Sequence, residues 1–278
     1  MSVNITAQDV NKLRQMTGVG IMDCKKALIE ANGDFEAAVD ILRKKGQKVS
    51  ANRAGRDAAE GVAIALTSAD GKMGVIVELN CETDFVAKNE EFGGFAHKVA
   101  ELALAQKPAN LEVLMNLNID GRSISDHITD MTGKIGEKIV LSNYHVVESE
   151  GVVPYIHGNK KIAVLVAMNK GLNESIEAAG KDVAMQIAAL SPVAVDKDDV
   201  DADTVKREIE IGKEQARAEG KPEEMLEKIA LGKLNKFYKE STLLNQDFVK
   251  DGSVTVGKML SNVENGLTVS SFIRTQVG

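Results

Sequence analysis

Two stretches in the middle of the sequence repeat one another. The tripeptide Glu60-Gly61-Val62 recurs as Glu150-Gly151-Val152, and each opens a pair of strand-like runs joined by a turn at residues 69–71 or 157–159. In both stretches a predicted helix and a third strand follow. A hairpin, a helix and a returning strand form one α+β layer. The repeat therefore predicts an α+β core of two similar subdomains, each an antiparallel sheet with a helix.

The helix of each copy is predicted from apolar residues at helical spacing. These are Phe92, Phe95, Val99 and Leu102 in the first copy and Ile176, Val183, Ile187 and Leu190 in the second. The closing strands begin at Ile139 and at Leu267. We therefore expect the first subdomain over residues 60–148 and the second over residues 149–195 and 241–278.

The two copies differ where the second strand joins the helix. The junction is short in the second copy, at residues 170–173, but longer in the first, where Cys81 to Asn89 include Thr83-Asp84-Phe85-Val86. This places a large ring beside a carboxylate in a chain with only 4% aromatic residues. Asp84 could cap the following helix and Phe85 could pack onto it as a hydrophobic staple. The second copy closes the same junction without such residues, which favours a functional role.

Residues 196–240 interrupt the second copy before its closing strand, and they predict a helical hairpin. Asp203 is expected to cap the first helix, which ends near Ala218. Gly220 then marks a stop and Pro222 a new start. The polar faces are dense in Glu and Lys, so the two helices should project as an antiparallel coiled coil. A solvated protrusion of this kind usually serves contact rather than chemistry.

Residues 1–50 predict a small domain of three helices. Thr6 and Asp9 have the spacing of a capping box at the first helix, and Asp34 is placed to cap the third. A unit of this size is near the lower limit for an independent core, so it should leave apolar atoms exposed. Residues 51–59 are polar and rich in Ala, and they are expected to form a partly helical linker.

Composition excludes several classes of protein. The net charge is −7 and the pI is about 5.3, whereas a general nucleic-acid binder needs a basic stripe. No apolar run approaches the roughly 20 residues that cross a membrane. The start shows neither a secretion signal nor a transit peptide, so a cytoplasmic protein is expected. The two cysteines lie far apart in sequence and are expected to be free thiols.

Motifs for catalysis, metal or cofactors find little support. Residues 252–258 match the spacing G-x-x-x-x-G-K of a phosphate-binding loop, but Met259 stands where a Ser or Thr should bind magnesium. The interior of this segment is β-branched and strand-like. The four histidines show no metal-ligand spacing, and no Ser/His/Asp set can be argued from spacing. We therefore expect no enzyme, no catalytic residues and no cofactor or metal of the protein's own.

Motifs along the chain, taken together and in order, are highly specific. They are Thr17-Gly18, Gly20 to Leu28 and Glu30 to Asp34 near the start, Asn80-Cys81 and Thr83 to Lys88 in the centre, then Lys134 to Glu137, His157-Gly158, Gly220 to Pro222 and Thr255 to Gly257. With them the chain resembles the bacterial elongation factor Ts family over essentially its whole length. The resemblance implies a ubiquitin-associated-like N-terminal domain, a core of two subdomains and a coiled-coil hairpin, in agreement with the segmentation above.

The resemblance also implies a function for the loop around Phe85. In the family this loop enters the nucleotide-binding domain of elongation factor Tu, and Thr83, Asp84, Phe85 and Val86 match it here. The ring wedges near the magnesium site, the ion is displaced, and GDP leaves so that GTP can bind. The chain is therefore expected to be a guanine-nucleotide exchange factor of translation elongation.

Further contacts with elongation factor Tu follow from the resemblance, residue by residue. Ile135 and Gly136 match family residues that touch the same partner domain. His157 matches a histidine near the partner's phosphate-binding loop. The apolar contact of the N-terminal helices is matched by Leu13, Ile21 and Met22. Position 21 is Ile where Met is common, a change that an apolar contact should tolerate. Some members continue into a C-terminal helical module, whose contacts are not expected here.

Two other functions remain open from the residues alone. The chain could be an adaptor that uses its N-terminal helices and its hairpin to build homo-oligomers, including a homodimer through the hairpin. An NTPase is a more distant alternative. Stimulated release of GDP from elongation factor Tu separates these possibilities, because only the exchange factor would cause it.

Overall fold

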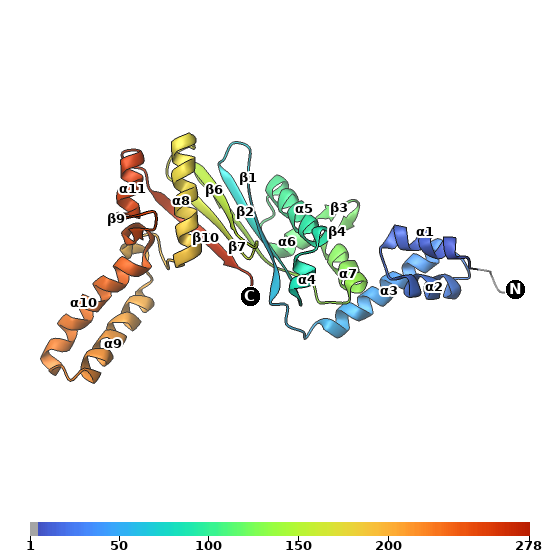
Figure 1. Cartoon of the computed structure of the whole chain (residues 1–278), viewed down its shortest axis with the longest axis horizontal. Coiled ribbons are helices and arrows are strands. Elements are labelled where there is room, and N and C mark those ends of the chain that lie inside the picture. The colour runs from blue at the N-terminus through green and yellow to red at the C-terminus, as the bar shows by residue number, and fades with distance from the viewer. Residues whose placement is uncertain (1–4) are drawn as a thin grey trace. The chain divides into compact units, whose positions relative to one another are not determined.

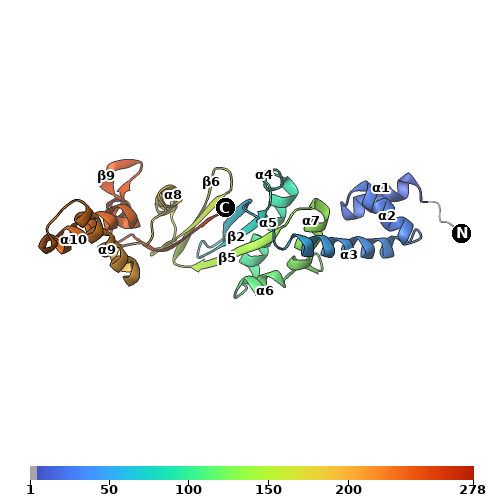
Figure 2. The same ribbon diagram turned by 90° about the horizontal axis from the view of Figure 1, so that it is seen from below.

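The computed structural model describes residues 5–278, so residues 1–4 of the predicted N-terminal domain lie outside the description. Figures 1 and 2 show the chain coloured from blue at the N-terminus to red at the C-terminus. Contacts divide the chain into two compact units. The first comprises Met1–Ile64, Val77–Tyr144 and Val277–Gly278, and the second comprises Ala65–Ile76 and His145–Gln276. Among the described residues, no helix combines the length and the apolar character needed to pass through a lipid bilayer.

The chain begins with three helices, α1 (Ala7–Thr17), α2 (Ile21–Glu30) and α3 (Phe35–Arg53). The predicted capping box is confirmed, because Thr6 and Asp9 bond to each other's backbone N–H groups. Asp34 caps α3 as expected. A small core of buried side chains holds the three helices together. Its members are Val10, Leu13, Cys24, Ala27, Leu28, Ala38 and Leu42.

Helix α3 continues beyond the small core and packs against α7 (Ile124–Ile135) in the same unit. Gly46 and Gly133 meet at this contact, where the absence of side chains lets the two helices approach closely. The expected boundary at residue 50 therefore falls inside a helix, and the linker is helical as far as Arg53. That residues 1–50 form a separate domain stays a prediction.

The repeat predicted from the sequence is present as two three-stranded sheets with the same strand order. One sheet has the order β1-β2-β5 and the other β10-β7-β6, so each hairpin's second strand lies in the middle. In the second sheet both pairings are antiparallel. The strands are β1 (Glu60–Thr67), β2 (Met73–Cys81), β5 (Val140–Glu148), β6 (Gly151–His157), β7 (Ile162–Met168) and β10 (Val269–Gln276).

The helices α5 (Glu90–Gln106) and α8 (Glu174–Leu190) correspond in detail. Each has 17 residues, each is capped by an asparagine, and each ends at a residue in the left-handed conformation. In the second unit α8 packs on β6 and β7, and it contributes Ile176, Val183 and Ile187 to the buried core. This correspondence supports duplication of one structural unit.

The duplicated unit is longer than the sequence analysis expected. A short hairpin and a helix precede the closing strand in each copy. These elements are β3 (Asn118–Ile119), β4 (Arg122–Ser123) and α7 in the first copy, and β8 (Asp247–Phe248), β9 (Asp251–Thr255) and α11 (Val256–Val263) in the second. The segment with phosphate-loop spacing thus forms a strand and the start of a helix, so it has no loop to curl around phosphates.

The segments between the first helix and this short hairpin differ between the copies. The first copy has only α6 (Leu111–Met115) there. The second copy has the 3₁₀ turn η1 (Lys197–Asp199), the predicted helical hairpin α9 (Ala202–Ala218) and α10 (Glu223–Ser241), and a second 3₁₀ turn η2 (Leu243–Asn245). The hairpin helices lie side by side (Figures 1 and 2).

Glycine and alanine bring the hairpin helices close together, because a Cβ atom on Gly212 would lie 3.0 Å from the Cα of Ala230. The predicted cap at Asp203 is wrong by two residues. Asp201 accepts the hydrogen bond from the Thr204 N–H at 2.8 Å, and Asp203 instead pairs with Lys206 in the first turn. Both aspartates fit the preference for acids at a helix start, so the sequence alone did not separate them.

Candidate functional site

The loop with Phe85 folds into a single helical turn, α4 (Asp84–Ala87). Thr83, not Asp84, is its N-cap. The Phe85 side chain points away from the core and is 82% exposed, which excludes the hydrophobic staple considered above. The Asp84 carboxylate pairs with Lys88 at 2.6 Å, and this hydrogen bond raises the pKa of the Lys88 ammonium. The fold therefore presents an apolar ring to solvent, where it can reach another molecule.

The Thr83 cap is tied to the loop that follows α7. Its N–H and its hydroxyl both donate to the Glu137 carboxylate, at 3.0 and 2.8 Å. Ile135 is the last residue of α7, and Gly136, its C-terminal cap with a φ of 81°, opens that loop. The structure therefore joins Thr83 to the segment that contains two further predicted partner-binding residues.

A second carboxylate makes the opposite link between the same two loops. Glu82 accepts a hydrogen bond from the Lys138 N–H at 2.6 Å and two from the Arg53 guanidinium at 2.8 and 2.9 Å. The N–H of Lys138, followed by the guanidinium, lowers the pKa of the Glu82 carboxyl. Sequence reasoning gave no role to Glu82 or Glu137. The available signal was that each lies within two residues of a proposed partner contact.

The N-terminal helices present an apolar surface in the same unit. Ile21 and Met22 are 48% and 63% exposed, and Met16, which sequence reasoning did not select, is 60% exposed. Leu13 departs from the expectation, because it is fully buried in the three-helix core. Because its side chain faces the core and not solvent, Leu13 can support this surface but cannot touch a partner directly.

His157 is the last residue of β6, next to the turn where the sequence placed it. It belongs to the second unit. It is exposed, and its register partner across the hairpin is Ile162. Its Nδ1 atom lies 3.0 Å from the hydroxyl of Tyr155, which belongs to the same strand. This contact orients the imidazole ring at the hairpin tip.

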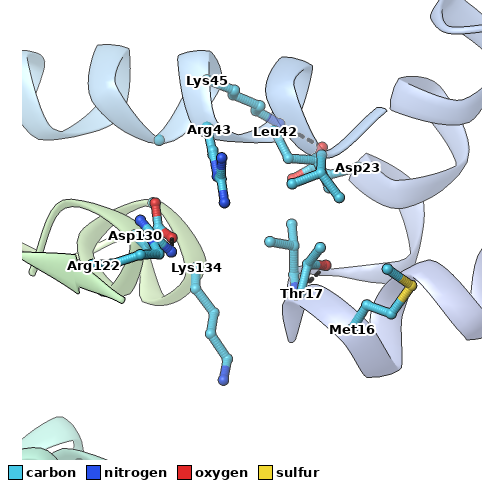
Figure 3. A pocket seen from close by; sticks show the side chains of 13 residues that line it. Met16, Thr17, Asp23, Leu42, Arg43, Lys45, Arg122, Asp130 and Lys134 are labelled. Carbon is cyan, nitrogen blue, oxygen red and sulfur yellow. Dashed lines mark hydrogen bonds and ion pairs between the residues drawn. The ribbon is translucent and has the colours of Figure 1, made fainter. Parts of the chain in front are cut away.

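A cavity of about 310 Å³ lies in the first unit beside α3 and α7 (Figure 3). Its lining includes Lys45, which pairs with Asp23 at 2.5 Å, and Arg122, which pairs with Asp130 at 2.6 Å. Lys134 also lines it and binds Glu91 at 2.7 Å. Arg43 lines the cavity as well, so its four cations outnumber the two acids of the lining, Asp23 and Asp130.

Residues that could hold a metal are not gathered in the described chain. Residues 5–278 contain no group of three His, Cys, Asp or Glu side chains placed to hold a metal ion. Cys24 and Cys81 are buried free thiols. Burial raises the pKa of the Cys81 thiol to about 12, which suppresses the reactive thiolate.

Comparison with known proteins identifies the same family along most of the chain. The family described as "Elongation factor TS" matches residues 82–278. A protein named "Elongation factor Ts" from Cytophaga hutchinsonii is 59% identical over 97% of this chain and 98% of its own length. Proteins with the same name are 56% identical in Amoebophilus asiaticus, over 99% of both chains, and 46% identical in Porphyromonas gingivalis, over 97% of both.

Proposed function

This chain belongs to the elongation factor Ts family, and we propose that it drives nucleotide exchange on elongation factor Tu by inserting the turn that contains Phe85. Members of the family are exchange factors and not enzymes. In the proposed mechanism Asp84 and Phe85 enter beside the partner's magnesium site, with Thr83 and Val86 framing the turn. The ion is displaced, GDP is released, and GTP can then bind.

The exposure of Phe85 is the observation that carries this proposal. A ring that is 82% exposed contributes little to the stability of its own protein. On a partner it could bury its apolar area and displace the surrounding side chains. Affinity for a magnesium–nucleotide complex depends on closely placed oxygen ligands, and each 1.4 kcal/mol lost weakens binding about tenfold. The exchange factor needs only to bind the distorted, nucleotide-free partner more tightly than the nucleotide-bound one.

Other surfaces would hold the partner while the turn acts. We assign this role to Ile135 and Gly136 beside the turn, to His157 at the β6–β7 hairpin, and to the exposed pair Ile21 and Met22. Leu13 would act from beneath, by fixing the helices that display this pair. None of these groups has to donate or accept a proton in a reaction, since no covalent bond is made or broken.

The helical hairpin is proposed as a separate contact arm. Ile211, Met225 and Leu231 on its two helices are 37%, 46% and 46% exposed, so apolar area is available for a further interface. We propose that a second copy of the chain binds there and forms a homodimer. The cytoplasm, where elongation factor Tu is at work, is the proposed location, and no direct contact with nucleic acid or membrane is required.

Release of labelled GDP from elongation factor Tu tests this function. The purified chain should accelerate release at sub-stoichiometric amounts, and excess free magnesium should oppose it by refilling the ion site. An adaptor without exchange activity would bind the partner or itself and leave the release rate unchanged. An NTPase would hydrolyse GTP without elongation factor Tu present.

A further inference from the structure

We propose that Glu82 and Glu137 are positioning residues for exchange, because they lock the Phe85 turn and the Ile135–Gly136 loop into one rigid contact surface. The inference rests on the proposed function for the use of that surface. We call the four residues Glu82, Thr83, Glu137 and Lys138 the carboxylate clasp. They occupy two loops that are more than 50 residues apart in sequence, at separations of 54 and 56 residues for the bonded pairs.

The clasp is reciprocal. Glu82 of the first loop accepts from the backbone N–H of Lys138 in the second loop, at 2.6 Å. Glu137 of the second loop accepts from the backbone N–H of Thr83 in the first, at 3.0 Å. Each carboxylate thus fixes the main chain beside the other one. Hydrogen bonds to an ionised acceptor are shorter and about twice as strong as neutral ones, so two of them strongly restrict relative motion of the loops.

The clasp lies next to the residues that are proposed to act. Phe85 follows Thr83 by two residues, and Gly136 directly precedes Glu137. Glu137 also receives the hydroxyl of Thr83 at 2.8 Å, the same side chain that caps the turn by accepting from the Val86 N–H. Glu137 therefore orients the cap as well as the backbone, and through the cap it sets the direction in which Phe85 projects.

The clasp is also joined to the N-terminal helices. Arg53, the last residue of α3, donates twice to Glu82. The ammonium of Lys138 donates to the carbonyl groups of Ala54 and Arg56, at 2.9 and 2.8 Å, just after that helix ends. A displaced clasp would therefore disturb both the Phe85 turn and the end of the helix that leads to the N-terminal apolar surface.

The second copy of the repeat provides an internal comparison. There the corresponding junction is closed by Asn169, which exchanges hydrogen bonds with Thr268, and by an ion pair between Lys170 and Glu264 at 2.6 Å. The duplicated fold thus closes this junction in both copies. Only the first copy uses two carboxylates on opposing backbone N–H groups, and only that junction contains an exposed phenylalanine. Because both copies close this junction, the alternative explanation is that Glu82 and Glu137 only stabilise the fold. The second copy supplies a matched control for that alternative.

The experiment measures exchange and loop mobility in the same set of full-length variants. Exchange is the rate of fluorescent GDP release from elongation factor Tu at saturating and at limiting exchange factor. Exchange is measured with Phe85 in place. Mobility is read in a parallel set that also has Phe85→Trp, from time-resolved fluorescence anisotropy of the indole, which is a single reporter because the chain contains no tryptophan. The set comprises Glu137→Ala, the conservative Glu137→Gln, Glu82→Ala, and Glu264→Ala as the control in the second copy.

Glu137→Ala should slow GDP release at saturation by about tenfold and increase the fast component of the anisotropy decay. Glu137→Gln should retain most of both properties, because its amide oxygen can accept from the Thr83 N–H. Glu82→Ala should show smaller effects of the same kind, because it removes the acceptor of the Lys138 N–H, and it decides the question if Glu137→Ala does not fold. Glu264→Ala should leave release and mobility unchanged.

Two results would overturn the clasp without touching the proposed function. One is normal exchange in Glu137→Ala and Glu82→Ala, whatever their mobility. The other is slower exchange with an unchanged anisotropy decay, which would assign the carboxylates to direct partner contact. If the unaltered chain itself fails to release GDP, the proposed function fails, and the anisotropy of the free variants still reports whether the clasp restrains the turn.

Discussion

Gly46 of α3 and Gly133 of α7 face each other where these two helices cross. The contact is asymmetric. A Cβ atom on Gly133 would lie 2.5 Å from the Cα of Gly46, whereas a Cβ atom on Gly46 would lie 3.6 Å from the Cα of Gly133. The first distance is far inside van der Waals contact and the second is ordinary, so the two positions should respond differently to the same substitution.

Gly133→Ala should therefore lower the free energy of unfolding by about 1–3 kcal/mol, because it overpacks a backbone contact. Gly46→Ala should be neutral or stabilising by about 0.5–1 kcal/mol, since alanine favours a helix interior over glycine. Urea denaturation of both variants measures the difference. Equal effects at the two positions would mean that α3 does not pack on α7 in this register.

Phe85→Ala should reduce GDP release at least about tenfold while leaving the free energy of unfolding within roughly 0.5 kcal/mol of the original, because the exposed ring has few contacts to lose. Phe92→Ala is the matched control. Phe92 is 1% exposed in the same unit, so its truncation should cost about 3–5 kcal/mol of stability. A Phe85→Ala protein with normal exchange would remove the turn from the mechanism.

Ile21 and Met22 are expected to bind, and Leu13 to support the fold. The double change Ile21→Ser with Met22→Ser should weaken binding to elongation factor Tu by roughly tenfold or more without lowering the melting temperature. Leu13→Ala should instead destabilise the protein by about 2–5 kcal/mol through a core cavity. Calorimetric titration and thermal melting distinguish these effects. Unchanged affinity in the surface variant would exclude docking through this face.

The sequence predicted the parts of the fold that depend on local pattern. Apolar spacing located α5 and α8, and the spacing of Thr6 and Asp9 located the start of α1. Short elements such as β3, with two residues, carry too few positions for alternation to be recognised. The exact cap of α9 was missed because two acids compete for the position. The partly helical character expected of the linker is confirmed as far as Arg53, the last residue of α3.

For the site, comparison of the two copies indicated Phe85, because the junction between the second strand and the helix has no corresponding residue in the second copy. The resemblance then added Ile135, Gly136, His157 and the N-terminal contacts. What neither source could supply was burial and long-range pairing. Leu13 and Met16 lie on the same helix, yet one is buried and the other exposed. The bonds of Glu82 and Glu137 span more than 50 residues of sequence, a distance at which no local pattern operates.

Acidification should release the Glu82 half of the clasp. The Lys138 N–H, with Arg53 and the nearby Arg56, lowers the pKa of Glu82 in the folded state from its ordinary value of 4.5. For a carboxyl group with a lowered pKa, the stabilisation is fully present above the ordinary value and is lost as the pH falls through the folded value. Glu82→Gln should therefore be less stable than the original at neutral pH, and the gap should narrow below about pH 4.5. Urea denaturation of both proteins across this pH range measures the difference in their free energies of unfolding. A difference that does not change with pH would contradict the role of the ionised Glu82 carboxylate.

The last prediction concerns whether the α9–α10 hairpin can be removed from the exchange factor. Its ends leave the fold together, because the Val193 N–H donates to the Ser241 carbonyl at 2.9 Å and Ala194 forms a bridge with Thr242. A short Gly/Ser link replacing residues 198–236 would keep this bridge, and it would keep Glu240, whose carbonyl accepts from Gln246. Closing a short loop between adjacent ends costs little entropy. The shortened protein should therefore melt cooperatively.

It should also retain a substantial part of its exchange activity, because Asp84, Phe85, Ile135, Gly136 and His157 all lie outside the excised residues. Self-association through the hairpin should weaken, which light scattering would detect as a mass decrease larger than the segment removed. Full-length protein with Met225→Lys and Leu231→Lys is the control, since it alters the hairpin surface and keeps its helices. Complete loss of exchange from a shortened protein with normal circular dichroism would place the hairpin inside the exchange mechanism. The arm would then have to contact elongation factor Tu itself.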